Sequence, residues 1–252
     1  MRTSFFALAA VAAFALSACS DSTGPDRTPL SVDEVFNEIE EVQSITAAAA
    51  GFAGAPMASH AMPAAGNCAF NTTSQSFVCP TTTATGVSFT RSFQLFDDAG
   101  TPQSAFNPTT TSAIRAISDA SGTFTNQNGS VDFSSHDDYT VAGLLLDNLT
   151  VDGSSTSESI VTNSQTGDVL EIDATTTIND LVIPRRRTGN RYPLGGSIET
   201  DIALTNDDQT ATVSVGIAFN GTSTATMTMS SALGTLTCLI DLSKQNKAPN
   251  CS

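Results

Sequence analysis

Apolar residues alternate with threonine, serine and aspartate along the last quarter of the chain. The apolar positions recur at even spacing in two neighbouring segments, first Ile198, Ile202 and Leu204, then Val213, Val215 and Ile217. Successive side chains of a β-strand point to opposite faces, so this pattern predicts strands with one buried face and one face in water. Turn residues follow each segment, Asp207-Asp208 and Asn220-Gly221, and we expect an antiparallel sheet built from hairpins.

The hairpin at Asn220-Gly221 can pair its strands in two registers. A two-residue turn would place Val213 opposite Thr228. A three-residue loop, with Gly221 in the left-handed conformation, places Val213 opposite Met227 and keeps both apolar sets on one face. We therefore predict the second register, with the threonines of the second strand outward (Thr224, Thr226 and Thr228) and with the next strand contributing to the buried face (Leu236, Cys238, Ile240 and Leu242).

Weaker alternation predicts more strands upstream. Residues 87–95 and 170–178 carry clear apolar faces, and shorter candidates lie at 114–118, 130–134, 139–147 and 149–162. The run Leu144-Leu145-Leu146 is compatible with a fully buried segment. Residues 101–113 are rich in proline, threonine and asparagine, so we expect a loop there.

The chain begins with a short apolar run, residues 5–16, that follows Arg2 and ends in Leu16-Ser17-Ala18-Cys19. The run is too short to span a bilayer of about 30 Å and has the layout of a signal peptide. Leu-Ser-Ala-Cys resembles the lipobox of bacterial lipoproteins. In that family the cysteine sulfur receives a diacylglycerol and the chain is cut just before it. The resemblance implies a signal peptide over residues 1–18 and lipidation at Cys19.

Residues 19–30 are then expected to be a lipidated tether, because they carry Asp, Ser, Thr, Gly and Pro without periodicity. In Gram-negative lipoproteins an aspartate directly after the cysteine retains the protein in the inner membrane. Ser20 stands at that position here. The resemblance therefore favours a lipid-anchored protein of the cell envelope, on the periplasmic or surface face of an outer membrane.

With Cys19 acylated, four cysteines remain and three pairings are possible. A hairpin that turns between Thr73 and Ser74 places Cys68 opposite Cys79, within the distance a disulfide needs. This geometry predicts Cys68–Cys79, which leaves Cys238 with Cys251. The cysteines lack the spacing of a metal site, and we expect no metal and no cofactor.

An amphipathic helix is expected over residues 31–50. Ser31 and Glu34 form a capping box at its start, and Val35 begins an apolar stripe that faces away from several glutamates. We expect the stripe to pack on the β-domain. Residues 51–66, rich in Ala, Gly and Pro, form a connector, and residues 67–252 form the antiparallel β-domain. The predicted fold is mainly β: a curved antiparallel sheet, a sandwich or an open half-barrel with this helix packed on it.

Charge limits the partners. Removal of Arg2 with the signal peptide leaves nine basic residues against twenty-five acidic ones, a net charge of −16. This argues against nucleic acid and against electrostatic adhesion to anionic lipid. Four of the basic residues cluster in a candidate anion-binding loop, because guanidinium groups suit phosphates, lipid headgroups and acidic glycans: Arg185, Arg186, Arg187 and Arg191. The competing interpretation is a solvated loop that pairs with the domain's own carboxylates.

Catalytic patterns are weak. His136, Asp137 and Asp138 are adjacent on an extended segment, so they point alternately to opposite faces and do not form a catalytic pair by themselves. Glu171 and Asp173 share a strand face and could meet Glu199 and Asp201 from a neighbouring strand. Four carboxylates together could bind Ca²⁺ or act as acid/base pairs. A polar outer face is the simpler interpretation.

Two functions fit these features. The first is a non-catalytic envelope lipoprotein, with a binding or structural role toward an envelope protein, glycan or lipid. The second is a carrier of a lipid or small apolar ligand in an open half-barrel, with the helix as lid. An enzyme is not expected.

Overall fold

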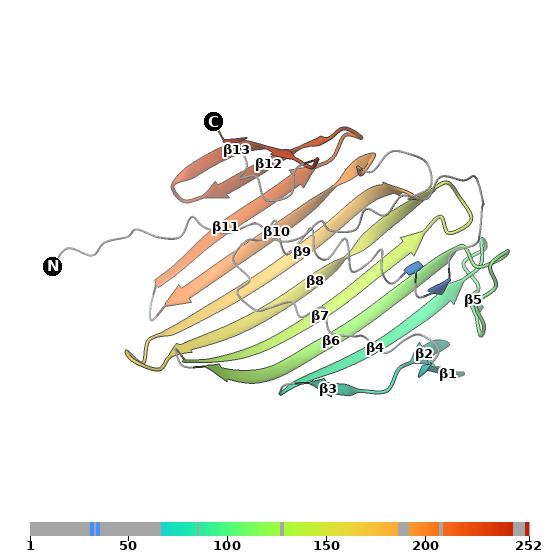
Figure 1. Ribbon diagram of the computed structural model, residues 1–252, viewed down its shortest axis with the longest axis horizontal. Coiled ribbons are helices and arrows are strands. Elements are labelled where there is room, and N and C mark those ends of the chain that lie inside the picture. The colour runs from blue at the N-terminus through green and yellow to red at the C-terminus, as the bar shows by residue number, and fades with distance from the viewer. Residues whose placement is uncertain are drawn as a thin grey trace.

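The computed structural model of the chain describes residues 31, 32, 34, 35, 67–84, 86–126, 129–185, 192–206, 209–243 and 250–251, and most of them belong to one antiparallel sheet of fourteen strands (Figure 1). The strands are β1 (Ala69–Asn71), β2 (Ser76–Val78), β3 (Thr82–Ala84), β4 (Val87–Phe96), β5 (Pro102–Gln103), β6 (Ala113–Asn126), β7 (Gly129–Ala142), β8 (Asn148–Asn163), β9 (Val169–Pro184), β10 (Gly195–Asn206), β11 (Gln209–Ala218), β12 (Thr224–Ser231), β13 (Gly234–Asp241) and β14 (Asn250–Cys251).

The sheet is a meander. Its path runs β1-β2-β4-β6-β7-β8-β9-β10-β11-β12-β13-β14, while β3 and β5 pair only with β4. Strands β1 and β14 lie at opposite ends of this path, so the sheet is open. The predicted antiparallel β architecture is confirmed. Because the described strands form one sheet, the sandwich alternative is wrong.

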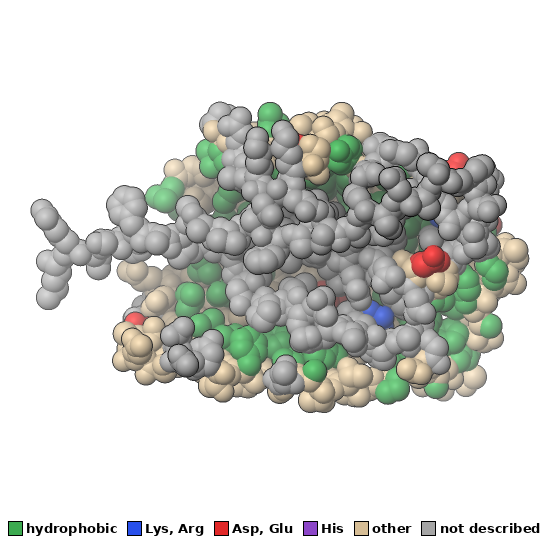
Figure 2. Space-filling view, in the orientation of Figure 1, with side chains coloured by type: hydrophobic (Ala, Val, Ile, Leu, Met, Phe, Trp, Pro, Cys, Tyr) green, Lys and Arg blue, Asp and Glu red, His purple; other side chains and the backbone are tan. Residues whose placement is uncertain are grey.

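Alternation gives the sheet two unlike faces. On β4 the buried side chains include Val87, Phe93 and Leu95, and the intervening positions are less buried. We call the face that carries these buried residues the inner face and its opposite the outer face. Figure 2 looks onto the inner face, where hydrophobic side chains gather over β4 to β8. A row of buried aliphatic side chains crosses five paired strands (Leu95, Ile114, Val141, Val151 and Leu181), each worth about 1.5–3 kcal/mol when removed from water.

A bulge in β9 helps to bend the sheet. The register of β9 shifts by one residue against both neighbours, between Val151 and Gly153 on β8 and between Gly195 and Ser197 on β10. Asp180 sits at the bulge with φ of 46°, and its N–H donates to Asp152 Oδ1 at 2.7 Å. An extra residue on one strand increases local twist and bend, which accounts for the curvature of the long strands in Figure 1.

The β11–β12 register differs from the prediction. Val213 pairs with Ser231 and Ile217 pairs with Met227, so the predicted pairing of Val213 with Met227 is wrong. The loop is longer than expected because Phe219 stays in the core, 7 % exposed, and Gly221 donates its N–H to Pro193 O at 3.0 Å. Gly221 is left-handed as predicted, with φ of 78°. The shift is even, so each strand keeps its predicted inward and outward sets. Leu236 of β13, predicted on the buried face, is nevertheless 41 % exposed near the outermost strand pair, so its predicted burial is wrong.

The run Leu144-Leu145-Leu146 is a turn and not a buried segment. Strand β7 ends at Ala142, and only Leu144 is buried, at 4 % exposure. Leu145 and Leu146 are 38 % and 65 % exposed. The predicted strand over residues 139–147 was therefore too long, because its last leucines continue the apolar pattern without a partner strand.

One disulfide lies at each edge of the sheet. Cys68–Cys79 joins the segments that flank β1 and β2, and Cys238–Cys251 joins β13 to β14. The predicted pairing of Phe70 with Phe77 is also observed. Their rings lie 5.1 Å apart, and the Phe77 ring stacks on Phe93 of β4 at 4.7 Å. Both predicted disulfides are present, and each one fixes an outermost strand pair.

A single helical turn is described before the sheet. Ser31 N–H donates to Glu34 Oε2 at 2.7 Å, and Glu34 N–H donates to Ser31 Oγ at 3.3 Å, which is the expected capping box. Val35 N–H donates to Ser31 O at 3.2 Å, and the Val35 side chain is fully buried in the core. Residues 36–50 lie outside the described residues, so the helix over 31–50 stays a prediction. Among the residues that the structure describes, no helix is long and apolar enough to cross a membrane.

Candidate functional site

A row of polar side chains crosses the apolar inner face. Cross-strand pairing aligns one residue from each of six neighbouring strands, β4 to β10: Arg91, Ser118, Asp137, Ser155, Thr176 and Thr200. We call these six residues the inner polar row. Four of them are buried, with Arg91 and Asp137 at 8 % exposure, Thr176 at 9 % and Thr200 at 2 %. Burying a polar group costs free energy unless the group is hydrogen-bonded, so the hydrogen bonds within the row show how this cost is offset.

Asp137 is the central acid of the inner polar row. Burial raises the pKa of its carboxyl, and hydrogen bonds from Ser155 and Ser118 partly oppose that rise. Ser118 Oγ donates to Asp137 Oδ2 at 3.1 Å. Within the described part of the chain, Oδ1 of Asp137 is buried and accepts no hydrogen bond. Burial also raises the pKa of the neighbouring Tyr139 hydroxyl, and the Asp137 charge raises it further.

The rest of the row is neutral or cationic. Thr176 Oγ1 and Thr200 Oγ1 share a hydrogen bond at 3.0 Å, which satisfies two buried hydroxyls across β9 and β10. Arg91 lies at an inward position of β4, between Phe89 and Phe93. Neither Arg91 nor Asp137 was predicted from the sequence to be a buried group. The signal was present, since both residues stand in phase with apolar neighbours of an alternating strand.

His136 and Asp138 lie on the outer face. As predicted, neither combines with the intervening Asp137, because Asp137 points inward. Asp138 binds the Arg115 guanidinium through two contacts, Nε to Oδ1 at 2.8 Å and Nη2 to Oδ2 at 2.5 Å. These hydrogen bonds hold the pKa of the Asp138 carboxyl below its usual range. His136 Nδ1 lies 2.7 Å from Asp119 Oδ1, and both of these side chains are exposed.

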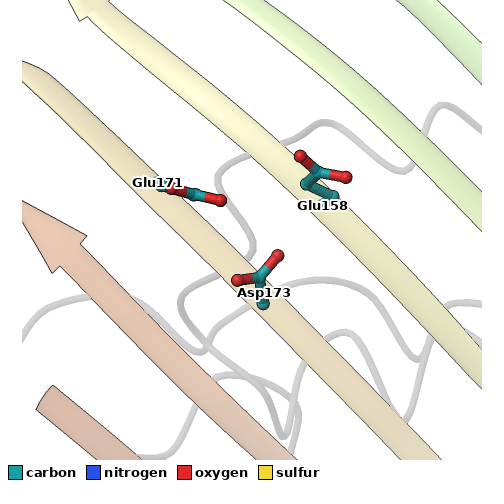
Figure 3. A group of neighbouring side chains, drawn as sticks. All are labelled: Glu158, Glu171 and Asp173. Carbon is teal, nitrogen blue, oxygen red and sulfur yellow. The ribbon is translucent and has the colours of Figure 1, made fainter. Parts of the chain in front are cut away.

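Three carboxylates gather on the outer face of β8 and β9 (Figure 3). They are Glu158, Glu171 and Asp173, whose nearest ligand atoms all lie within 4.8 Å of one another. The predicted partners Glu199 and Asp201 do not join them, because these residues pair with Thr177 and Thr175 further along β9. That part of the expectation is wrong. Two of the three carboxylates are exposed, which is typical of a solvated polar face.

The candidate anion-binding loop is described only at its first residue. Arg185 Nη1 donates to Leu146 O at 3.1 Å, and its backbone N–H donates to Asp147 O at 3.1 Å. Arg186, Arg187 and Arg191 lie outside the described residues. Arg185 thus links this loop to the β7–β8 turn, and anion binding by the four arginines stays a prediction.

An open hollow of about 560 Å³ lies at the far end of the inner face, where β9, β10 and β11 meet their turns. Its apolar wall is formed by Leu170, Leu204 and Ala211, and its polar edge by Asn206, Gln209 and Thr210. A hollow of this kind can accept part of an apolar molecule. On the outer face, the charge pairs among the described residues do not bring an acid, a base and a nucleophile together.

Comparison with known protein families, with curated proteins and with solved structures gives no significant match. The lipidation residue Cys19 and the tether lie outside the described residues, so they remain predictions from the sequence.

Proposed function

We propose that this protein is a lipid-anchored, non-catalytic protein of the cell envelope, with a binding or structural role. The observation that carries the proposal is the pair of disulfides that close both edges of the sheet. Disulfides persist in oxidising compartments outside the cytoplasm, which agrees with the lipobox-like Leu16-Ser17-Ala18-Cys19.

The charge arrangement supports binding rather than catalysis. On the outer face, Arg115 is paired with Asp138, and His136 is paired with Asp119, across neighbouring strands. On the inner face, the buried Asp137 is held by serine hydroxyls. Nucleic acid is an unsuitable partner at the net charge of −16 expected once residues 1–18 are removed, and an envelope protein, glycan or lipid is the class that we propose.

The anchor is tested with Cys19→Ser. The variant lacks the thiol that would receive the diacylglycerol, so we expect loss of radiolabelled fatty-acid incorporation and release from the membrane fraction. The described β-domain does not include residue 19, and both disulfides should still form. A variant that stays in the membrane pellet after a carbonate wash would overturn the anchor.

A second candidate function is transport of a lipid or small apolar ligand. The observation in its favour is the hollow of about 560 Å³ beside Leu170 and Leu204, which opens on the apolar inner face. We expect native mass spectrometry of the gently extracted protein to show a retained mass that Leu204→Trp removes by filling the hollow. Leu233→Trp, at a fully exposed turn, is the matched control. A protein that carries no retained mass would exclude this candidate and leave the first one intact.

A further inference from the structure

The inner polar row divides the inner face into two unlike halves. On one side of it, the row of aliphatic side chains from Leu95 to Leu181 is at most 1 % exposed. On the other side, toward the ends of β8 and β10 on the left in Figure 1, the inner positions of β6 to β9 are half-buried. We call this second part the open half, and it includes Ala120, Phe133, Ser135, Ser157, Ile172 and Ala174.

Small side chains line the open half next to the inner polar row. Cross-strand pairing aligns one from each of four strands, β6 to β9: Ala120, Ser135, Ser157 and Ala174. Each of them lies two residues from a member of the inner polar row on its own strand, so it points to the same face. Small side chains project little from a sheet, so a bound molecule can approach the backbone there. Beyond them, Phe133 and Ile172 lead toward the hollow beside Leu170 and Leu204.

Asp137 is the member of the row whose hydrogen bonding is incomplete. Its side chain is 8 % exposed and accepts hydrogen bonds from Ser118 and Ser155, but its Oδ1 atom accepts none within the described part of the chain. No Lys or Arg among the described residues forms an ion pair with it, and Arg91 of the row stands two strands away, about 10 Å. A buried carboxylate that lacks both a cation and a hydrogen bond is stabilised by a ligand that supplies both.

The separation of Asp137 from the hollow sets the length of such a ligand. Leu204 lies three strands across the sheet from Asp137, and it lies four residues along β10 from Thr200 of the row. At about 4.8 Å per strand and about 3.3 Å per residue, the two positions are about 20 Å apart. An extended alkyl chain advances about 1.25 Å for each C–C bond of about 1.5 Å, so a chain of sixteen carbons spans about 19 Å.

We propose that the open half binds a cationic amphiphile, a long-chain amine whose head group pairs with Asp137 and whose alkyl chain ends in the hollow beside Leu204. The inference rests on the second candidate function, transport of a lipid or small apolar ligand, and names the ligand class. An ammonium group donates hydrogen bonds and carries the charge that the buried carboxylate lacks. The strongly acidic chain also attracts a cation and repels an anion, so a fatty acid is a poor ligand for this site.

The head group is tested on the unchanged lipidated chain in a neutral detergent. Hexadecylamine, hexadecanol and hexadecanoate are added separately at equal concentration, and native mass spectrometry measures the fraction of chain that retains each one. The three probes share one tail, so they differ only in the charge and hydrogen bonding of the head. We expect the amine to bind at least about tenfold more tightly than the alcohol, as one charge-assisted hydrogen bond allows, and the carboxylate to bind most weakly.

Equal retention of the amine and the alcohol would overturn the proposal and leave the carrier function in place, whereas retention of none of the three would exclude the carrier itself. Asp137→Asn then separates the buried carboxylate from the overall charge of the chain. The amide has nearly the same shape without the charge, so we expect amine binding to fall at least about tenfold, to the level of the alcohol. Hexadecanol binding, which needs only the tail contacts, should be unchanged and shows that the variant folds.

Asp138→Asn is the matched control, because it removes the same charge from the outer face, where Asp138 binds Arg115. We expect it to leave the binding of all three probes unchanged. An equal loss of amine binding in both variants would show that overall charge sets the preference, and undiminished amine binding in Asp137→Asn would show that the head group lies elsewhere. Either result would overturn the proposal.

Chain length tests the tail. Leu204→Trp fills the hollow, so we expect it to weaken the binding of hexadecylamine. Decylamine spans only about 11 Å and does not reach the hollow from Asp137, so its binding should be unchanged in this variant. Leu233→Trp, at the fully exposed turn, should affect neither amine. The same effect of Leu204→Trp on both amines, whether a loss or none, would overturn the placement of the tail in the hollow.

Discussion

At the scale of single residues, the sign of a charge and the face it occupies decide its role. Asp137 and Asp138 are adjacent, yet one carboxyl is buried in the inner polar row and the other is paired with Arg115 on the outer face. Their pKa values accordingly move in opposite directions, upward for Asp137 through burial and downward for Asp138 through its hydrogen bonds to Arg115.

The opposite pKa shifts of Asp137 and Asp138 predict opposite pH dependences of their contributions to stability. The Asp137 pKa is raised on folding, so its contribution falls as pH rises through the unfolded value, near 4, toward the folded value. Asp137→Asn should remove that decline and raise the free energy of unfolding at neutral pH, because burial penalises the ionised carboxylate and not the neutral amide. Asp138 has a lowered pKa, so its contribution is present above the unfolded value and is lost as pH falls.

Asp138→Asn is the matched control. It should lower the free energy of unfolding at neutral pH by less than about 1 kcal/mol, as expected for a partly exposed pair, and should flatten the acid side of the profile. Urea unfolding at a series of pH values measures both variants. A destabilised Asp137→Asn at neutral pH would mean that the ionised carboxylate is stabilised by its surroundings, against the cause assigned here.

At the scale of elements, the β11–β12 hairpin shows which features depend on local sequence and which on tertiary contacts. In the observed register Ala218 pairs with Thr226, whereas the register expected from the sequence would pair Ser214 with Thr226. Cysteines at 218 and 226 should therefore crosslink under mild oxidation, and cysteines at 214 and 226 should not. Non-reducing gel mobility after proteolysis between the strands distinguishes the two pairs. A 214–226 crosslink would show that the hairpin has the shorter loop predicted from the sequence.

The inward and outward sets of this hairpin were predictable because side-chain alternation has a period of two and survives any even shift of register. The loop length was not, because it depends on the burial of Phe219 and on the hydrogen bond from Gly221 to Pro193, a residue of another connection. The inner polar row was missed for a similar reason. Its members come from six strands, and only their pairing in the sheet brings Arg91, Asp137 and Thr200 into one line.

At the scale of the whole molecule, an open sheet has two edges that a closed one would lack. Unpaired edge strands invite association with other chains, and here each edge ends in a short strand fixed by a disulfide. The disulfides lie at opposite ends of the strand path, so neither one can support the edge that the other protects. An open sheet therefore implies that its two edges are stabilised independently of each other.

Independent edges predict that the losses of unfolding free energy caused by removing the two disulfides add. Cys68→Ser with Cys79→Ser opens a loop with a sequence separation of 11, and Cys238→Ser with Cys251→Ser opens one with a separation of 13. On the chain-entropy model each loss should cost about 2–3 kcal/mol of unfolding free energy. Edges that share no contacts should give a quadruple variant whose loss equals the sum of the two within about 0.5 kcal/mol. Denaturant unfolding of the three variants measures this, and a large deviation from the sum would mean that the two edges touch in solution.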